Sequence, residues 1–144
     1  MKPAAFTLEQ PTSAALLMQS QQGRIMAGGQ SLGPMLNLRV AQPPHVVAIG
    51  QIPEFAAVEE TADAVIADGR VPDIGKGILP AIAQGIAYRA VRNRGTIGGS
   101  LCHADPAADW LCTLTALGAA VMTLTANGGR NIALTRFVTG PFRN

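Results

Sequence analysis

Two of the three glycine pairs in the chain are each preceded by an apolar residue and followed by a serine nearby. The two segments are Ala27-Gly28-Gly29-Gln30-Ser31-Leu32 and Arg92-Asn93-Arg94-Gly95-Thr96-Ile97-Gly98-Gly99-Ser100. Glycine permits positive φ and a close approach between backbone and ligand. Successive backbone N–H groups in such a turn, followed by a helix N-terminus, form a binding site for anions. Two such loops in one small chain suit a ligand with two phosphates, such as a dinucleotide.

Each loop also has a simpler interpretation. A Gly-Gly turn after a strand often serves only to reverse the chain. Arg92 and Arg94 add positive charge to the second loop, but a solvated basic turn would contain the same residues. The phosphate-binding interpretation therefore depends on whether the fold brings the two loops together.

Two carboxylates follow the second loop in the segment 103–110. Asp105 is expected to cap a helix that has Pro106 in its first turn. Asp109 then lies deeper in that helix and could accept a hydrogen bond from a ligand hydroxyl. His103 has no cysteine or histidine neighbour at metal-ligand spacing, so we interpret it as a structural residue or a loop donor and predict no metal site.

The sequence also contains a competing catalytic motif. The residues Gly29-Gln30-Ser31-Leu32-Gly33 match G-x-S-x-G, the nucleophile elbow of serine hydrolases. Asp73 and His103 follow Ser31 in the order that this fold uses. The motif needs a large central sheet, for which a chain of 144 residues offers little room. A serine hydrolase that uses Ser31 remains an alternative hypothesis.

Composition excludes several classes of protein. The chain is 48% hydrophobic and 14% charged, which is typical of a packed core, and its 16 glycines and 10 prolines predict many turns. The net charge of +2 is dispersed, so neither a nucleic acid nor a membrane surface is an expected partner. Cys102 and Cys112 form no C-x-x-C pair and are expected to be small buried residues. The N-terminus shows no signal-peptide pattern. Together with the two unpaired cysteines, this favours a cytoplasmic location for the protein.

The uncharged stretch 110–129 is long enough to span a bilayer. Gly118 interrupts it, and four threonines are distributed along it. We therefore predict a helix that ends at Gly118 and is followed by a strand, with no membrane span.

The elements that must position the first loop alternate along the chain. A helix is predicted after a cap at Thr12 or Ser13 and is expected to end at Gly23, and a short strand follows at 24–27. A second helix should follow Ser31, with Leu32, Met35, Leu36 and Leu38 packed inward. A second strand is predicted at 45–49. This order implies a small parallel sheet flanked by helices.

For the remaining chain, the sequence predicts a mixture of antiparallel strands and helices. Strands are predicted at 55–59 and 62–66, and a helix at 79–88. A further helix carries Trp110, and Asn127-Gly128-Gly129 indicates a hairpin. The fold class predicted from the sequence is therefore α+β, with two lobes, 1–58 and 59–144, that meet near Glu59.

The segments AGGQSLGPMLNLR and AYRAVRNRGTIGGSLCHADPAADW together resemble the FAD-binding medium subunits of molybdenum hydroxylases, the family of carbon monoxide dehydrogenase and xanthine dehydrogenase. The resemblance extends over residues 6–142. It implies two α+β lobes with FAD between them. It assigns the pyrophosphate to Ala27, Gly28, Gly29, Gln30, Ser31 and Leu32 and to Thr96, Ile97, Gly98 and Gly99. Ser100 stands where many relatives have asparagine. Asp109 would contact the ribityl side of the flavin, with Asp105 nearby.

The resemblance also implies a role in a larger oxidoreductase. A molybdopterin large subunit would oxidise the substrate, and electrons would pass through a 2Fe-2S small subunit to FAD and on to an acceptor. The flavin does the redox chemistry, so no amino-acid catalyst is expected, and the chain is not expected to be active alone.

The chain departs from the family pattern at two places. Val65-Ile66 runs directly into Ala67-Asp68-Gly69, where relatives carry an additional segment that helps to cover the flavin. Relatives also continue well beyond the position of Asn144. A further alternative is therefore a truncated or degenerate fragment that keeps the fold but no longer holds FAD.

Overall fold

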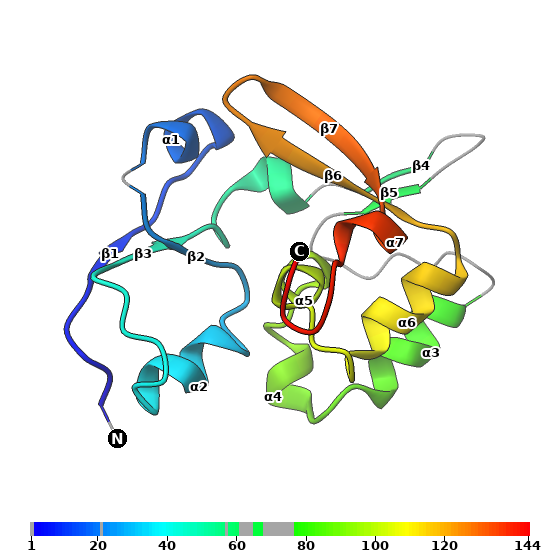
Figure 1. Ribbon diagram of the computed structural model, residues 1–144, viewed down its shortest axis with the longest axis horizontal. Coiled ribbons are helices and arrows are strands. Elements are labelled where there is room, and N and C mark those ends of the chain that lie inside the picture. Colours follow the sequence, from blue (N-terminus) through cyan, green and yellow to red (C-terminus); the bar gives the residue numbers. More distant parts are fainter. Residues whose placement is uncertain (1, 21, 57, 61–64, 68–76) are drawn as a thin grey trace.

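The computed structural model describes residues 2–20, 22–56, 58–60, 65–67 and 77–144. The N-terminal part contains β1 (Thr7–Glu9), α1 (Ala14–Gln19), β2 (Arg24–Met26), α2 (Leu32–Asn37) and β3 (His45–Ala48). The strands form one parallel sheet in the order β1-β3-β2 (Figure 1). The predicted parallel sheet with flanking helices is confirmed.

The central strand β3 forms the core of this sheet. Val46, Val47 and Ala48 are buried, as expected for a parallel strand paired on both edges. Strand β1 was not predicted, because its three residues have mixed polarity and are too few to show a periodic pattern. Leu38 was expected to face inward, but it is 61% exposed because α2 already ends at Asn37.

Two side chains accept hydrogen bonds from the N-terminal end of helix α1. The Ser13 hydroxyl oxygen accepts a hydrogen bond from Leu16 N at 3.2 Å, which confirms one of the two predicted caps. The helix ends at Gln19 rather than at Gly23, because Ser20 turns into an extended conformation. A carboxylate oxygen of Glu54, in the 3-10 helix η1 (Pro53–Ala56), accepts from Ala14 N at 3.0 Å.

The Glu54 contact predicts a pH-dependent contribution to stability. The hydrogen bond from Ala14 N lowers the pKa of Glu54 below its ordinary value of 4.5. A lowered pKa in the folded state stabilises the fold above 4.5, and this contribution is lost as the pH falls through the folded-state pKa. We therefore expect Glu54→Gln to lower the urea midpoint at pH 7, and the difference from the wild type to shrink in acid. An unchanged difference at both pH values would contradict this assignment.

The second part contains β4 (Val58–Glu60), β5 (Val65–Ala67), α3 (Ile78–Gly85), α4 (Arg89–Arg92) and α5 (Ile97–His103). These are followed by α6 (Asp109–Ala116), β6 (Ala120–Thr125), β7 (Gly128–Ala133) and α7 (Leu134–Phe137). The pairs β4–β5 and β6–β7 are both antiparallel. The α+β class is confirmed, with the parallel sheet first and the antiparallel pairs after it.

Several boundaries in this part differ from the prediction. Phe55 belongs to η1 rather than to a strand, and residues 62–64 and 68–76 lie outside the described residues. The helix predicted to reach Tyr88 ends at Gly85, and Ala87 has φ +40°. The stretch 110–129 does form a helix and then a strand, and Gly118 has φ +69° at the junction. Among the described helices, none has the length and hydrophobicity that crossing a bilayer would require.

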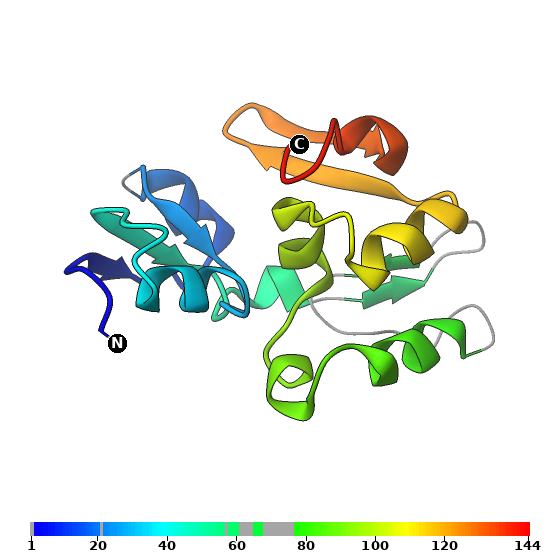
Figure 2. The same ribbon diagram turned by 60° about the horizontal axis from the view of Figure 1, so that its bottom comes forward.

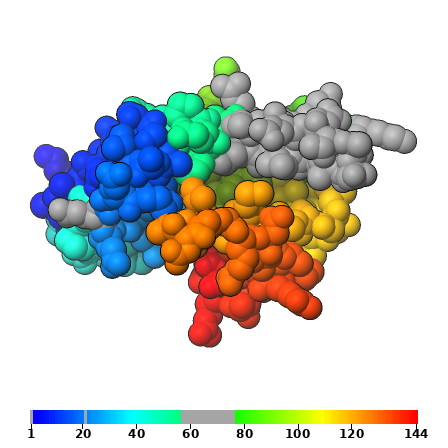
Figure 3. All heavy atoms as spheres, turned by 90° about the horizontal axis from the view of Figure 1, so that it is seen from above, coloured from blue at the N-terminus to red at the C-terminus, as the bar shows by residue number. Residues whose placement is uncertain are grey.

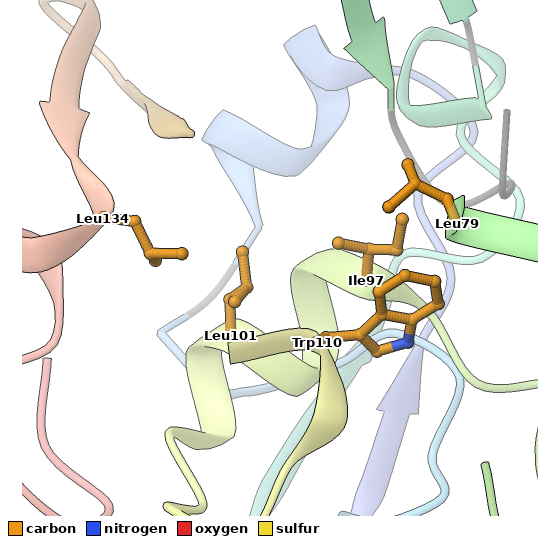
Figure 4. Close-up of a cluster of buried hydrophobic side chains, with 5 residues drawn as sticks. All are labelled: Leu79, Ile97, Leu101, Trp110 and Leu134. Carbon is orange, nitrogen blue, oxygen red and sulfur yellow. The ribbon is translucent and has the colours of Figure 1, made fainter. Parts of the chain in front are cut away.

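The main core lies between the helices of the second part. Figure 2 shows β6, β7 and α7 as one layer over α5 and α6, with α3 and α4 on the opposite side. Side chains from these layers meet in one buried cluster (Figure 4), formed by Leu79, Ile97, Leu101, Trp110 and Leu134. Seen from above, the hairpin β6–β7 also reaches across to the N-terminal part near α1 (Figure 3).

Candidate cofactor-binding site

The two glycine loops are in direct contact. Gly28 packs so closely against the carbonyl group of Arg94 that a Cβ at this position would overlap the carbonyl oxygen. A Cβ built on Gly99 would lie 3.4 Å from Cβ of Ala27. The β2–α2 and α4–α5 connections therefore lie side by side between the two halves of the molecule (Figure 1). The fold thus joins two segments that are almost 70 residues apart in the sequence.

The first loop presents backbone donors toward its surroundings. Gly29 has φ +71°, and its carbonyl accepts from Gly33 N at 2.8 Å to begin α2. The Gln30 side-chain amide donates to the Gly28 carbonyl at 3.1 Å, which holds the turn. Within the described residues, the backbone N–H groups of 29–32 have no hydrogen-bond partner. The exposed Ser31 precedes α2, and its hydroxyl makes no capping bond to the helix.

The glycine pair of the second loop lies in the first turn of helix α5, which the sequence did not predict. The Thr96 hydroxyl oxygen accepts from Gly99 N at 3.0 Å and caps α5. Ile97 points into the core, so only its backbone is available to a ligand. No acceptor among the described residues faces the N–H groups of Ile97 and Gly98. Gly98 is exposed, and a Cβ there would meet nothing within 4 Å.

A sequence signal for α5 was present but weak. Thr96 is a favourable N-cap residue, and Ile97 and Leu101 are four residues apart on one face. Two glycines in the first turn obscured this pattern, because glycine is a poor helix former. Both apolar residues are buried, so core packing stabilises the helix and leaves Gly98 on its open face.

The capping bond predicts a defined stability change. Removing the hydroxyl in Thr96→Ala should lower the free energy of unfolding by about 0.5–2 kcal/mol, because Gly99 N loses its acceptor. Chemical denaturation measures this difference. Thr96→Ser is the matched control, since serine keeps the oxygen and should retain most of the stability. Equal destabilisation by both replacements would show that the hydroxyl is not the relevant group.

The two aspartates have different roles. Asp105 is half-buried, and its Oδ1 accepts from Ala107 N at 2.9 Å, so it caps a single turn between α5 and α6. The predicted helix starting at Pro106 is wrong in position, because α6 begins only at Asp109. Asp109 is therefore at the first position of α6 rather than deeper within it. Its carboxylate is exposed and has no hydrogen-bond partner in the described structure, which leaves it free for a ligand hydroxyl.

Other candidate residues are used by the fold. Arg92 donates from Nη1 to the carbonyls of Ile86 and Ala87 at 2.9 and 3.0 Å, so it holds the α3–α4 turn. The ring of His103 packs against that of Phe142 with 5.2 Å between centroids. The half-buried Ser100 donates its backbone N–H to the Thr96 carbonyl at 3.1 Å.

The prediction of buried cysteines is wrong. Cys102 and Cys112 are both free thiols with exposed surface. The side chain of Cys102 is nevertheless partly enclosed, and this burial raises the pKa of its thiol. Neither cysteine joins a metal-binding cluster within the described residues.

The serine hydrolase hypothesis finds no support in this geometry. Ser31 precedes a helix of six residues, and the sheet beside it has three strands rather than a large central sheet. Asp73 lies outside the described residues, and His103 packs against Phe142. A surface groove lies elsewhere, between α1, β2 and the hairpin. It is lined by Leu17, Met18, Ser20, Gln22, Gly23, Ile25, Val47 and Leu124.

The residues of the two loops fit a bound diphosphate. At the starts of α2 and α5, which are electropositive helix ends, backbone N–H groups have no acceptor among the described residues. The open space at Gly98 leaves room for a ligand, whereas the close contact at Gly28 holds the loops together. No carboxylate lies within either loop to repel an anion.

The chain matches the family model described as "FAD binding domain in molybdopterin dehydrogenase" over residues 5–144. It is 35% identical to the nicotine 6-hydroxylase medium subunit of Paenarthrobacter nicotinovorans, over 99% of this chain and 55% of the relative. It is 34% identical to the carbon monoxide dehydrogenase medium chain of Hydrogenophaga pseudoflava, with the same two coverages. The chain therefore spans about half the length of these relatives.

Solved structures show the same similarity. A chain of carbon monoxide dehydrogenase from Hydrogenophaga pseudoflava, in a form lacking the Mo-pyranopterin moiety, superposes with a TM-score of 0.91 at 34% identity, over 100% of this chain and 55% of that chain. A chain of quinoline 2-oxidoreductase from Pseudomonas putida 86 superposes with a TM-score of 0.90 at 32% identity, over 99% of this chain and 55% of that chain.

The sequence alignment with the nicotine 6-hydroxylase subunit covers 156 positions, which is more than the 144 residues of this chain. That relative therefore has additional residues inside the matched region.

Proposed function

Because the chain belongs to the family of FAD-binding domains in molybdopterin dehydrogenases, we propose that its two glycine loops hold the diphosphate of FAD. The observation that carries this proposal is the contact between Gly28 and the Arg94 carbonyl, which brings both sets of free N–H groups to one place. The loops come from the two proposed lobes, 1–58 and 59–144. FAD would therefore lie between the lobes, with its diphosphate at their junction.

The residues that would hold FAD divide by the groups they offer. Backbone N–H groups of 29–32, Ile97 and Gly98 are the proposed phosphate donors. The Ser31 hydroxyl is an additional donor, since it makes no capping bond. Thr96 and Gly99 bond to each other and shape the loop, and Ala27 and Gly28 keep the two loops in contact.

Asp109 is the proposed partner of a hydroxyl on the ribityl chain. Its exposed carboxylate accepts hydrogen bonds, and helix α6 fixes its backbone beside α5. Asp105 supports this placement indirectly, because its bond to Ala107 N sets the turn between α5 and α6. Ser100 offers a hydroxyl one turn after Thr96, with no side-chain partner in the described structure.

When bound, FAD supplies the redox chemistry, and the protein supplies binding, orientation and electrostatics. In this proposal the chain is an electron-transfer subunit of a molybdenum-containing oxidoreductase and has no catalytic residue of its own. A molybdopterin large subunit and a 2Fe-2S small subunit would provide the electrons, and the complex would be cytoplasmic. The names of several relatives, medium subunit or medium chain, support the assignment of this chain as one subunit of a larger complex.

The carrier role is tested by how bound FAD is reduced. The purified chain, loaded with FAD under anaerobic conditions, should lose its flavin absorption with dithionite and recover it with an artificial electron acceptor. Nicotine and carbon monoxide, after which two of the relatives are named, should not reduce the bound FAD on their own. The reason is that the substrate site is proposed to lie on another subunit. Reduction by either substrate with this chain alone would contradict the proposed division of labour.

A further inference from the structure

The C-terminal segment folds into a small closed turn. Thr139 N donates to the Arg143 carbonyl at 3.0 Å, and Arg143 N donates to the Gly140 carbonyl at 3.0 Å. Gly140 and Arg143 also form an isolated antiparallel bridge. We call residues 139–144 the C-terminal turn.

The C-terminal turn contacts the end of α5. Phe142 N donates to the Ala104 carbonyl at 2.8 Å, and the side-chain amide of Asn144 donates to the Cys102 carbonyl at 2.8 Å. The ring of Phe142 packs against His103 at an interplanar angle of 59°. The last carbonyls of a helix have no partner inside the helix, so these bonds satisfy groups that would otherwise need water.

Both sides of this junction have an unusual backbone. Ala104 has φ +53° and Phe142 has φ +57°. The left-handed region is rare for residues other than glycine, and for a bulky residue it is a genuine outlier. Such conformations persist where the surrounding structure imposes them, and they occur frequently at functional sites. Phe142 keeps this conformation although the residue is 58% exposed, so burial of the ring does not explain it.

Helix α5 connects this junction to the second glycine loop. It is seven residues long, so its two ends are about 10 Å apart at 1.5 Å per residue. Ile97 and Leu101 anchor one face in the core, and Thr96 caps the first turn. The helix carries the free N–H groups of Ile97 and Gly98 at one end and the contacts with the C-terminal turn at the other.

We propose that Phe142 and Asn144 are positioning residues, which fix helix α5 from its C-terminal end and thereby place the Thr96–Gly99 loop for the cofactor diphosphate. This inference rests on the proposed function for its ligand, but the coupling between the two ends of α5 is a property of the chain alone. Neither residue is part of the loops that would hold the diphosphate.

The test compares Asn144→Ala with Asn131→Ala, which removes an exposed asparagine side chain from β7. Amide hydrogen exchange is first measured on the FAD-free chain. In Asn144→Ala, exchange at Gly99 and Ser100 should rise several-fold, because their bonds to Thr96 loosen. Exchange at the buried residues Val46 and Val47 should not change. Unchanged exchange at Gly99 and Ser100 would overturn the inference.

The second readout is FAD affinity, measured by titration of the same variants. Asn144→Ala should weaken binding by about threefold to tenfold, the scale of one neutral hydrogen bond. Asn131→Ala should bind as the wild type does, and Asn144→Gln should recover part of the loss because it keeps the amide donor. Equal affinity in Asn144→Ala and the wild type would overturn the positioning role. If no variant and not even the wild type bound FAD, the proposed function would fail, whereas a changed exchange pattern would still support the coupling.

Discussion

Gly98→Val is expected to remove most FAD from the purified chain while leaving the fold intact. A Cβ at Gly98 meets no atom within 4 Å, so the free protein tolerates the larger residue. The added methyl groups would instead fill the space through which phosphate oxygens reach the N–H groups of Ile97 and Gly98. Each lost bond to a charged oxygen costs about 1.5–3 kcal/mol, which weakens binding by about 10-fold to 150-fold.

The measurement is the ratio of flavin absorption to protein absorption after unbound FAD has been removed. Cys102→Ala is the control, because it changes the same helix away from its first turn. The midpoint of thermal unfolding without FAD should be nearly the same in the wild type and both variants. Equal flavin retention in Gly98→Val and Cys102→Ala would show that this loop does not hold the cofactor.

Gly28→Ala is expected to damage both the fold and the site. The new Cβ would overlap the Arg94 carbonyl oxygen, and no flexible side chain can move to relieve the contact. The two loops must therefore separate, at a cost of about 1–3 kcal/mol for overpacking. Because the proposed site needs both loops together, FAD retention should fall along with stability.

Gly33→Ala is the matched control for this second prediction. It adds the same methyl group in α2, where a Cβ would meet nothing within 4 Å. Alanine is a better helix former than glycine by roughly 1 kcal/mol, so Gly33→Ala should be neutral or stabilising. Urea denaturation and FAD titration of both variants give the comparison. If Gly28→Ala were as stable as Gly33→Ala and retained FAD, this result would contradict the close contact between Gly28 and the Arg94 carbonyl.

Strands β2 and β3 of the parallel sheet and the hairpin were predictable because their signals are local. β3 contains the apolar run Val46-Val47-Ala48, and Asn127 precedes Gly128 where the turn after Thr125 meets β7. By contrast, α5 was missed because its stability comes from burial of Ile97 and Leu101, which tertiary packing supplies. The start of α6 was misplaced because Asp105 has the same capping chemistry in an isolated turn as at a helix N-terminus.

The sequence identified the two loops of the candidate site, but not the contacts that each of their residues makes. Two glycine pairs identified the loops, yet only the fold shows that Gly28 contacts the second loop and that Gly98 faces open space. The sequence likewise could not separate Arg92, which holds a turn, from a cation that faces the ligand. These distinctions depend on contacts between residues far apart in the chain.

The most direct test is the visible absorption spectrum of the purified chain before and after addition of excess FAD and removal of the unbound fraction. We predict flavin bands near one equivalent per chain, because both loops present free N–H groups at one junction. A chain that is folded by circular dichroism but retains no flavin would contradict this prediction. The similarity to the family would then reflect common ancestry without the cofactor.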